Sequence, residues 1–265
     1  MPELPEVETA RRLAARALAG RRIVGVATVD DPIVYAGVSP RRLAAALRGR
    51  RVTAVGRKGK HLWLELDRRP WPAFHFGMSG SFRVYGEEAD RPRYWKVELR
   101  ASDGARLALR DPRRLGRIRL LRDPANEPPI SRLGFDVLDD MPDAGELRAL
   151  LSRRKATIKA VLLDQGLFAG VGNWIADEAL FQARISPHRP ASSLDASEVT
   201  RLRRQLGAIV GRAVKVLARK REFPRGWLFH RRWGRDSSAH TLRAERIVHE
   251  TIGGRTAAWV PSRQR

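Results

Sequence analysis

The amino-acid sequence predicts an α+β protein, and three observations lead to this class. Apolar residues recur at helical spacing close to the N-terminus, short alternating apolar runs fill residues 22–121, and helical spacing returns between residues 145 and 220. Strands grouped before helices are typical of α+β folds or of separate domains. At 265 residues the chain is long enough for two modest domains, each with its own core.

The first element is an amphipathic helix that begins almost at the N-terminus. Val7, Leu13, Ala14 and Leu18 recur at helical spacing, and Gly20 is placed to end the helix. The region that follows contains the runs RIVGVATV, HLWLELD, YWKVELR, RLALR and RIRLL, which Gly, Pro and charged turns separate. These runs predict a β-rich domain.

A proline-rich and acidic stretch marks the predicted domain boundary. We expect an N-terminal domain over 1–122, a linker over 123–144, a helical domain over 145–222 and a C-terminal segment over 223–265. Helices are expected at about 145–153, 156–164, 173–184 and 195–220.

Two local signals support these assignments. Asp195 and Glu198 have capping-box spacing at the start of the long helix. Near the C-terminus, Gly253 and Gly254 join the strand-like runs RIVHE and TAAWV, which predicts a β-hairpin.

The charge of the chain indicates a polyanionic partner. Lys and Arg total 52 against 29 Asp and Glu, which gives a net charge of +23 and a pI near 11.6. Such an excess attracts phosphate backbones through counterion release, so nucleic acid is the expected partner. The alternative is a solvated basic surface of an Arg-rich sequence. A membrane surface is disfavoured because no basic amphipathic helix or lipidation signal is present.

The composition also excludes several classes of chemistry. The chain has no cysteine, which excludes disulfides, thiolate catalysis and cysteine-ligated zinc. The opening MPELPEVETARR lacks the apolar core of a signal peptide, and no apolar run reaches spanning length. We expect a soluble cytoplasmic protein.

Pro2 is the first candidate for chemistry. Removal of Met1 would leave Pro2 as a secondary amine, and an α-amino group has a pKa near roughly 8, which leaves a reactive neutral fraction at physiological pH. Such an amine can attack a sugar C1′ and form an iminium ion that promotes strand elimination. Glu3 and Glu6 are placed to supply acid and base functions beside it. Taken alone, a Met-Pro start more often indicates only a processed terminus.

Five motifs in order resemble the formamidopyrimidine-DNA glycosylase and endonuclease VIII family. They are PELPEVETARR at the start, GRKGKHLWLEL at 56–66, HFGMSG at 75–80, DPRRLG at 111–116 and AGVGNWIADEALF at 169–181. The opening is closer to the formamidopyrimidine branch. The resemblance implies an N-terminal β-sandwich, a helix–two-turn–helix domain that binds DNA, and a C-terminal finger.

The resemblance also assigns roles to single residues. Pro2 would form the Schiff base, Glu3 would handle protons, and Lys60 on a β-hairpin would support the chemistry, where an isolated lysine would be interpreted as surface charge. Base extrusion leaves a gap that the enzyme must fill. Met78 and Arg113 match the family's gap-filling residues, and Leu115 replaces its phenylalanine; an apolar side chain can wedge but offers no aromatic face.

Other matches concern DNA and lesion binding. Asn173 and the backbone amides that follow it lie at a predicted helix N-terminus, which favours a phosphate, although an ordinary helix cap is an equal interpretation. The resemblance makes Lys159 a second phosphate ligand and Glu178 an acid near the lesion pocket. The branch's longer lesion-covering loop is reduced here to residues 221–230.

The finger departs from the family pattern. Members commonly hold zinc with four cysteines, and His230, His240 and His249 have unconvincing spacing for such a site. We therefore expect a zincless finger that presents Arg255 to DNA at the hairpin tip. Aromatic side chains would replace the metal by apolar burial: Trp227, Phe229, Trp233 and Trp259.

The expected function is that of a bifunctional DNA glycosylase and AP lyase of base excision repair. It would remove oxidised bases through a Pro2 Schiff base, nick the strand by β,δ-elimination, and need no metal or organic cofactor. The expected partner is double-stranded DNA with damaged bases or abasic sites, bound by a monomer in the cytoplasm at the nucleoid.

Three alternatives stay open. The first is an enzyme selective for pyrimidine lesions or abasic sites with weak 8-oxoguanine activity, suggested by Leu115 and the short 221–230 stretch. The second is a damaged-DNA-binding protein without turnover, against which Pro2, Glu3 and Lys60 argue. The third, an RNA-binding or ribosomal protein, leaves residues 1–120 unexplained.

Overall fold

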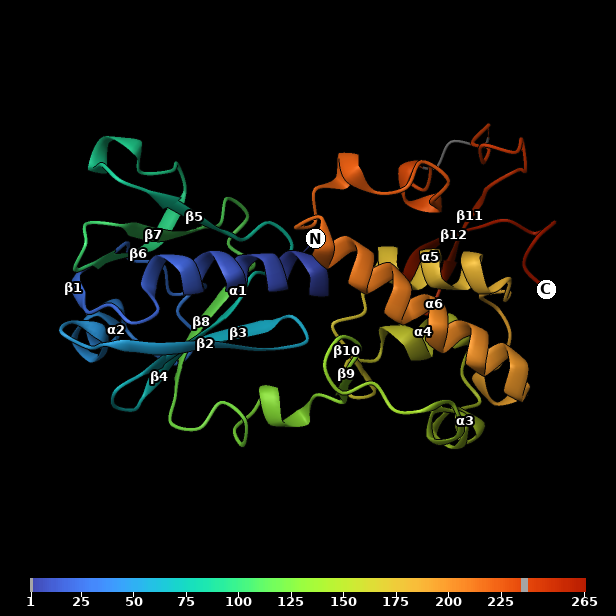
Figure 1. The fold of residues 1–265 in the computed structure, drawn as a ribbon, viewed down its shortest axis with the longest axis horizontal. Coiled ribbons are helices and arrows are strands. Elements are labelled where there is room, and N and C mark those ends of the chain that lie inside the picture. The colour runs from blue at the N-terminus through green and yellow to red at the C-terminus, as the bar shows by residue number, and fades with distance from the viewer. Residues whose placement is uncertain (1, 235–237) are drawn as a thin grey trace. The chain divides into compact units, whose positions relative to one another are not determined.

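The computed structural model describes residues 2–234 and 238–265. These divide into two compact units, one of residues 2 and 6–132 and one of residues 3–5 and 133–265. The predicted α+β class is confirmed, with sheets in the first unit and helices plus a C-terminal hairpin in the second (Figure 1).

The first unit is built from two four-stranded antiparallel sheets, as expected for a β-sandwich. One sheet has the order β1-β6-β7-β5 and the other β2-β3-β4-β8. Their strands are β1 (Ile23–Thr28), β2 (Val52–Lys58), β3 (His61–Leu66), β4 (Trp71–His75), β5 (Ser81–Tyr85), β6 (Trp95–Ala101), β7 (Arg106–Arg110) and β8 (Arg117–Leu121).

Two helices complete the first unit, α1 (Leu4–Leu18) and α2 (Pro40–Leu47). Val7 and Leu18 on the apolar face of α1 are buried in one core with residues of both sheets. Leu64 and Phe74 come from one sheet and Leu107 from the other. The helical spacing predicted from the sequence is therefore explained by burial between strands that come from two different sheets.

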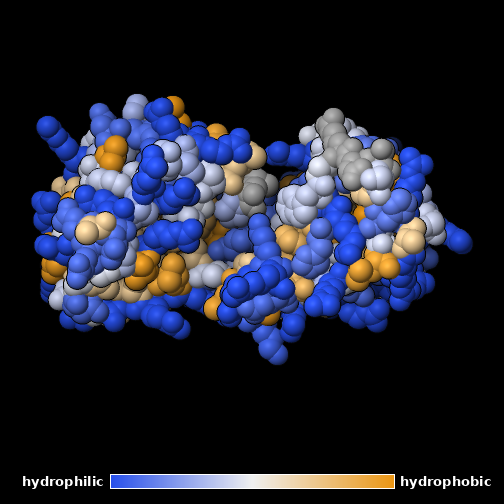
Figure 2. Space-filling view, turned by 90° about the horizontal axis from the view of Figure 1, so that it is seen from above, coloured by the Kyte–Doolittle hydropathy of each residue, from blue (hydrophilic) through white to orange (hydrophobic). Residues whose placement is uncertain are grey.

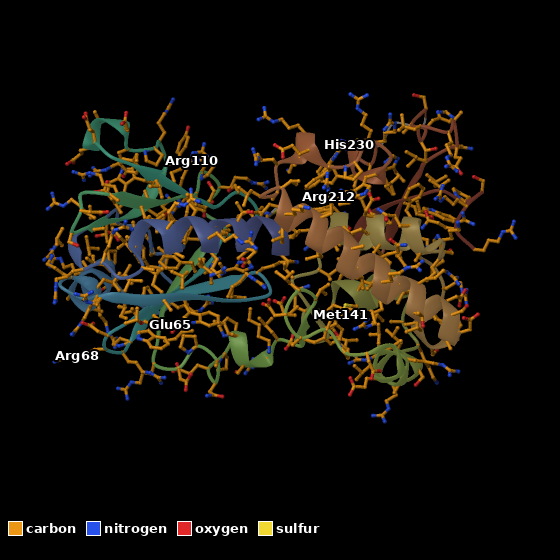
Figure 3. The ribbon with its side chains drawn as sticks, viewed as in Figure 1. Glu65, Arg68, Arg110, Met141, Arg212 and His230 are labelled. Atoms are coloured by element: carbon orange, nitrogen blue, oxygen red, sulfur yellow. The ribbon has the colours of Figure 1, made fainter. Side chains whose placement is uncertain are left out.

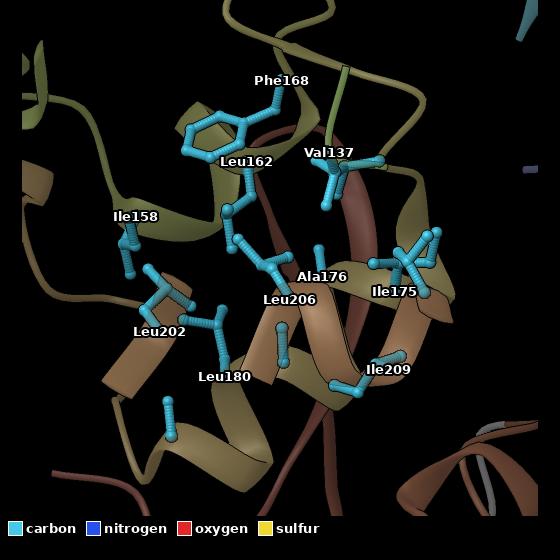
Figure 4. Close-up of a cluster of buried hydrophobic side chains, with 14 of the residues drawn as sticks. Val137, Ile158, Leu162, Phe168, Ile175, Ala176, Leu180, Leu202, Leu206 and Ile209 are labelled. Atoms are coloured by element: carbon cyan, nitrogen blue, oxygen red, sulfur yellow. The ribbon is translucent and has the colours of Figure 1, made fainter. Parts of the chain in front are cut away.

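The second unit is mainly helical. Its helices are α3 (Ala144–Ser152), α4 (Ile158–Leu163), α5 (Asn173–Ala183) and α6 (Ala196–Lys215), and short strands β9 (Phe135–Asp136) and β10 (Phe168–Ala169) pair in parallel. Figure 4 shows the core in which side chains of α4, α5 and α6 meet, including Leu162, Leu180 and Leu206.

The predicted capping box at α6 is confirmed, but the helix ends earlier than residue 220. Asp195 accepts from the Glu198 amide at 2.8 Å, and Glu198 binds the Asp195 amide in return. After Lys215, Leu217 and Ala218 have φ angles of 53° and 51°, so the backbone leaves the helix in the left-handed region.

The C-terminal hairpin is confirmed with a shifted first strand. The strands are β11 (Val248–Ile252) and β12 (Arg255–Trp259), and β12 lies beside α5 (Figure 1). Gly253 and Gly254 form the turn with φ angles of 59° and 74°, a conformation that glycine adopts without steric cost.

No helix in the described part of the chain is long and apolar enough to cross a membrane. Figure 2 shows hydrophilic side chains over most of the visible surface, as the net charge of +23 leads one to expect.

Candidate active site and nucleic-acid interface

Pro2 lies just before the first turn of α1 and is half-buried. Glu6, also half-buried, lies within that first turn. The predicted nucleophile, Pro2, and the predicted proton-transfer residue, Glu6, are therefore both at the N-terminus of α1. The predicted loss of Met1 concerns a residue outside the described ones. The chemical requirement for an N-terminal secondary amine at Pro2 therefore stays a prediction.

Glu3 is fixed by the N-terminus of α5. Its carboxylate accepts the backbone N–H groups of Trp174 at 2.9 Å and of Ile175 at 3.2 Å, and only 2% of the residue is exposed. An anion is favoured at this position because helix N-terminal amides lack intrahelical acceptors. The expectation that these two amides bind a phosphate is therefore wrong, since a carboxylate of the chain already occupies them.

The glycines of the AGVGN motif make room for this contact. A Cβ at Gly172 would lie 2.2 Å from the Glu3 Cδ, and a Cβ at Gly170 would lie 2.6 Å from a Leu4 methyl carbon. Gly170 also has a φ angle of 95°, which side-chain-bearing residues rarely adopt. The motif thus forms a close-fitting support for residues 3 and 4.

Lys60 lies in the two-residue turn between β2 and β3, as the resemblance implied for its hairpin. Gly59 precedes it with a φ angle of 56°. Arg57 donates to the Gly59 carbonyl at 3.1 Å and to the Glu8 carboxylate on α1 at 3.2 Å. Glu8 thereby links the helix that follows Pro2 to the turn that carries Lys60.

The Glu8 carboxylate is ionised at all moderately acidic to neutral pH values. Burial raises its pKa, but hydrogen bonds from Arg11 and Arg12 and the charges of Arg11 and Arg57 outweigh burial and lower the pKa to about 2. A permanent anion among three arginines is a structural anchor, because its charge does not change near neutral pH.

The three predicted gap-filling residues lie on two loops that are bound to each other. Asp111 is fully buried and accepts from Ser79 at 2.8 Å and from the Gly116 amide at 2.7 Å. At Gly77 a Cβ would lie 2.3 Å from the Leu115 carbonyl oxygen, so the loops pass in direct contact.

These loops expose the side chains that the prediction requires. Met78 is 42% exposed and Leu115 is 38% exposed. Arg113, two residues before Leu115, is also exposed. Large exposed apolar side chains are suited to wedging between the bases of DNA. The structure therefore brings the Met78 and Leu115 loops together.

Lys159 does not face the surface. It is 0% exposed, forms an ion pair with Asp177, and donates to the Asn173 carbonyl at 3.1 Å. Its direct binding to a phosphate is contradicted by this burial. Asn173 instead donates from Nδ2 to the Thr256 carbonyl at 2.8 Å, which joins the start of α5 to the hairpin.

Glu178 is also buried, and it supports the segment after α6. Its carboxylate accepts from the Phe229 amide at 2.8 Å and from the Gln182 side chain at 2.7 Å. Burial raises its pKa to about 7, although these hydrogen bonds act in the opposite direction. In this arrangement the acid contacts the 221–230 stretch, and a direct contact with a lesion stays a prediction.

The side chains present do not fit a zinc site. His230 (Figure 3) and His249 contact the carbonyls of Phe223 and Arg232, each at 3.3 Å, and His240 is exposed. Among residues 2–234 and 238–265, no three His, Asp or Glu side chains are grouped closely enough to hold a metal.

The predicted aromatic replacement for zinc is wrong in its details. Trp233 is 52% exposed, while Trp227 and Phe229 pack against Trp174 in the helical core. The ring centroids of Trp259 and His188 lie 5.2 Å apart. The hairpin has its own small apolar cluster, formed by Phe181, Leu228, Ile247, Ala258 and Val260. Arg255 is exposed at the first position of β12, as expected.

Sequence reasoning missed Asp177, Arg232 and Glu8, the three residues that organise these surroundings. Asp177 in the mostly buried NWIADEALF helix was a detectable signal, because an ionised residue on a buried helix needs partners. Its partner Arg232 is 55 residues away and carries no local sequence signal.

Comparisons with known proteins agree with this architecture. The model of the formamidopyrimidine-DNA glycosylase N-terminal domain matches residues 1–118, and that of its H2TH domain matches residues 133–223. A formamidopyrimidine-DNA glycosylase of Arabidopsis thaliana is 39% identical over 278 residues, which cover 100% of this chain and 71% of that protein. The enzyme of that name from Stenotrophomonas maltophilia is 37% identical over the full length of both.

Two solved structures have similar folds. The Lactococcus lactis formamidopyrimidine-DNA glycosylase bound to DNA with an AP site has a TM-score of 0.86 at 24% identity, with 99% of each chain covered. MutM in complex with DNA containing carbocyclic 8-oxo-G has a TM-score of 0.86 at 25% identity, with 100% of each chain covered.

Proposed function

This chain belongs to the formamidopyrimidine-DNA glycosylase family, and we propose that it excises oxidised bases from duplex DNA through a Schiff base on Pro2 and then nicks the strand. The observation that carries the proposal is the immobilised carboxylate of Glu3, the residue that directly follows Pro2 in the chain. Two helix amides, those of Trp174 and Ile175, hold this carboxylate. Such fixed geometry favours proton transfer at a neighbouring reacting centre.

The proposed reaction proceeds in balanced steps. The neutral Pro2 nitrogen attacks C1′, the C1′–base bond breaks with its electron pair going to the base, and a carboxyl group supplies the proton that the base takes up. The Pro2 nitrogen then loses its proton, the C1′–O4′ bond breaks, and O4′ takes up a proton, so that opening of the sugar ring gives a cationic iminium. Loss of a C2′ proton expels the 3′ phosphate, a second elimination expels the 5′ phosphate, and hydrolysis returns the amine.

DNA binding is assigned to residues of both units. Met78, Arg113 and Leu115 would fill the gap left by the extruded base, and Arg255 and the remaining amide hydrogen of Asn173 would bind phosphate. Lys60 would assist the chemistry from its hairpin. Because the substrate is genomic duplex DNA, we place the protein at the nucleoid in the cytoplasm, acting as a monomer.

Borohydride trapping on a duplex with a damaged base or abasic site tests the nucleophile. The protein with Pro2 at its N-terminus should form a covalent complex. The same chain with an N-terminal extension that converts the Pro2 nitrogen into an amide should form none, and removal of the extension should restore trapping. Tight binding by the Pro2-terminal protein without trapping would contradict the proposal.

A second candidate keeps the chemistry but changes the substrate. Phe223, Trp227 and Phe229 of the short stretch after α6 are buried against Trp174, so this stretch is packed into the core rather than placed to cover an everted base. This favours abasic sites or oxidised pyrimidines over 8-oxoguanine. Trapping rates on duplexes with 8-oxoguanine, a formamidopyrimidine, an oxidised pyrimidine and an abasic site distinguish the two.

A further inference from the structure

We propose that Asp177 is a positioning residue that holds the C-terminal hairpin and Asn173 in their DNA-binding arrangement. This inference rests on the proposed function, because it concerns how the same DNA interface is assembled. All the groups involved belong to the second unit.

One carboxylate joins three separate segments of the chain. Its Oδ1 pairs with Lys159 of α4, and its Oδ2 accepts from Arg232 Nε at 3.1 Å, from Arg232 Nη2 at 2.6 Å and from the Ala258 amide of β12 at 3.1 Å. Asp177 itself lies on α5 and is 2% exposed. Four donors therefore converge on one side chain, and none of the three donor residues is adjacent to Asp177 in sequence.

The network continues to the residues assigned to phosphate. Lys159 also donates to the Asn173 carbonyl, and the Asn173 side chain donates to Thr256. Thr256 lies between Arg255 and the Ala258 amide that Asp177 binds. Asp177 thus supports Asn173 through Lys159 and supports Arg255 through β12, which a purely local ion pair would not do.

The hairpin is held by a small apolar cluster and by a close contact at its tip. A two-stranded hairpin is marginal by itself in water, and the apolar cluster of this one contains only five buried residues among those described. At the tip, a Cβ on Gly253 would lie 2.8 Å from the Ala160 methyl carbon, so the turn sits tightly on α4. Asp177 adds a polar cross-link to this packing, at the Ala258 amide of β12.

The ordinary interpretation is that a buried ion pair serves stability alone. Buried pairs often contribute little net stability, because desolvation offsets their attraction. Lys159 shows this cost, since burial lowers its pKa while Asp177 raises it. The two interpretations predict different changes in DNA binding, so they can be separated by experiment.

The test uses Asp177→Asn in the full chain, with a duplex that carries an abasic-site analogue. We expect the affinity for this duplex to be roughly 10- to 100-fold weaker, the effect of losing one charge-assisted hydrogen bond between the protein and a phosphate. The slope of log affinity against log salt should become shallower by about 1 for each phosphate that the variant no longer binds.

A double-mutant cycle of DNA affinities distinguishes the positioning of Arg255 from a general effect on stability. If Asp177 acts through Arg255, the Asp177→Asn/Arg255→Ala variant should bind no more weakly than Asp177→Asn alone. Glu198→Gln, which weakens the α6 cap elsewhere in the unit, serves as the destabilised control and should keep the normal salt slope. Additive decreases in affinity, or an unchanged slope in Asp177→Asn, would overturn the inference.

A charge-free variant keeps the test decisive if Asp177→Asn does not fold. Lys159→Met/Asp177→Leu/Arg232→Met removes all three buried charges together, a replacement that buried ion triads tolerate. We expect it to fold and still bind with the reduced slope; normal affinity and slope would refute a positioning role. Failure of the unmodified protein to trap would instead contradict the proposed function.

Discussion

Glu8 and Glu178 are both buried carboxylates, but their surroundings shift their pKa values in opposite directions. Around Glu8, arginine hydrogen bonds and charges overcome burial, and the pKa falls to about 2. Around Glu178, burial dominates three neutral donors, and the pKa rises to about 7. The first residue is a permanent anion, whereas the second changes its charge within the physiological range.

This difference predicts how Glu178→Gln changes stability with pH. Between pH 4.5 and about 7 the folded protein binds more protons at Glu178 than the unfolded chain does, so this group lowers the free energy of unfolding as pH rises. Glutamine resembles the neutral acid, so the variant should be more stable than the unmodified protein at pH 8, by on the order of 3 kcal/mol. Urea unfolding at pH 4.5 and pH 8 measures the difference.

The control for this experiment is Glu8→Gln. Its lowered pKa gives the opposite dependence: the stabilisation by Glu8 is complete above pH 4.5 and is lost as pH falls toward 2. That variant should therefore be less stable than the unmodified protein at pH 8. A Glu178→Gln stability difference that is the same at pH 4.5 and pH 8 would show that Glu178 is ionised in the folded protein.

At the scale of single elements, the start of α5 offers a test of the Glu3 support. Gly172→Ala places a Cβ 2.2 Å from the Glu3 Cδ, and the carboxylate must move away from the helix amides. We expect trapping on an abasic duplex to slow by at least about tenfold, because misplacement of a catalytic group by about 1 Å costs up to roughly 100-fold. Single-turnover trapping rates provide the measurement.

Gly207→Ala is the matched control. It makes the same change inside α6, where a new Cβ meets nothing within 4 Å. Alanine should stabilise that helix by about 1 kcal/mol and leave trapping unchanged. Equal trapping rates for Gly172→Ala and the unmodified protein would mean that the position of Glu3 is not needed.

The elements also show what could be predicted from sequence and why the rest could not. Apolar spacing located α1, and the glycine pair located the final turn, because both signals are local. The early end of α6 depends on left-handed residues Leu217 and Ala218, which carry no glycine signal. Lys159 was assigned to phosphate by motif position, but its burial depends on Asp177, 18 residues away.

For the whole molecule, the excess of basic residues is organised by a small number of buried acids. Asp31 holds Lys96 and Arg114, and Asp177 holds Lys159 and Arg232. Each acid fixes more than one cation inside the fold. Because the acids are so outnumbered, 29 against 52, most of the surplus charge remains for an external anion.

This surplus predicts a steep salt dependence for binding to undamaged duplex DNA. If six to ten phosphates are contacted, the affinity should fall by about 10³- to 10⁵-fold between 50 and 200 mM salt, with a log–log slope near −0.9 for each phosphate. Anisotropy of a labelled duplex measures the slope. The trapping rate at saturating protein is the internal control and should change little with salt, since covalent attack by Pro2 releases no further counterions. A slope shallower than about −2 would instead indicate that the basic residues form a solvated surface with few phosphate contacts.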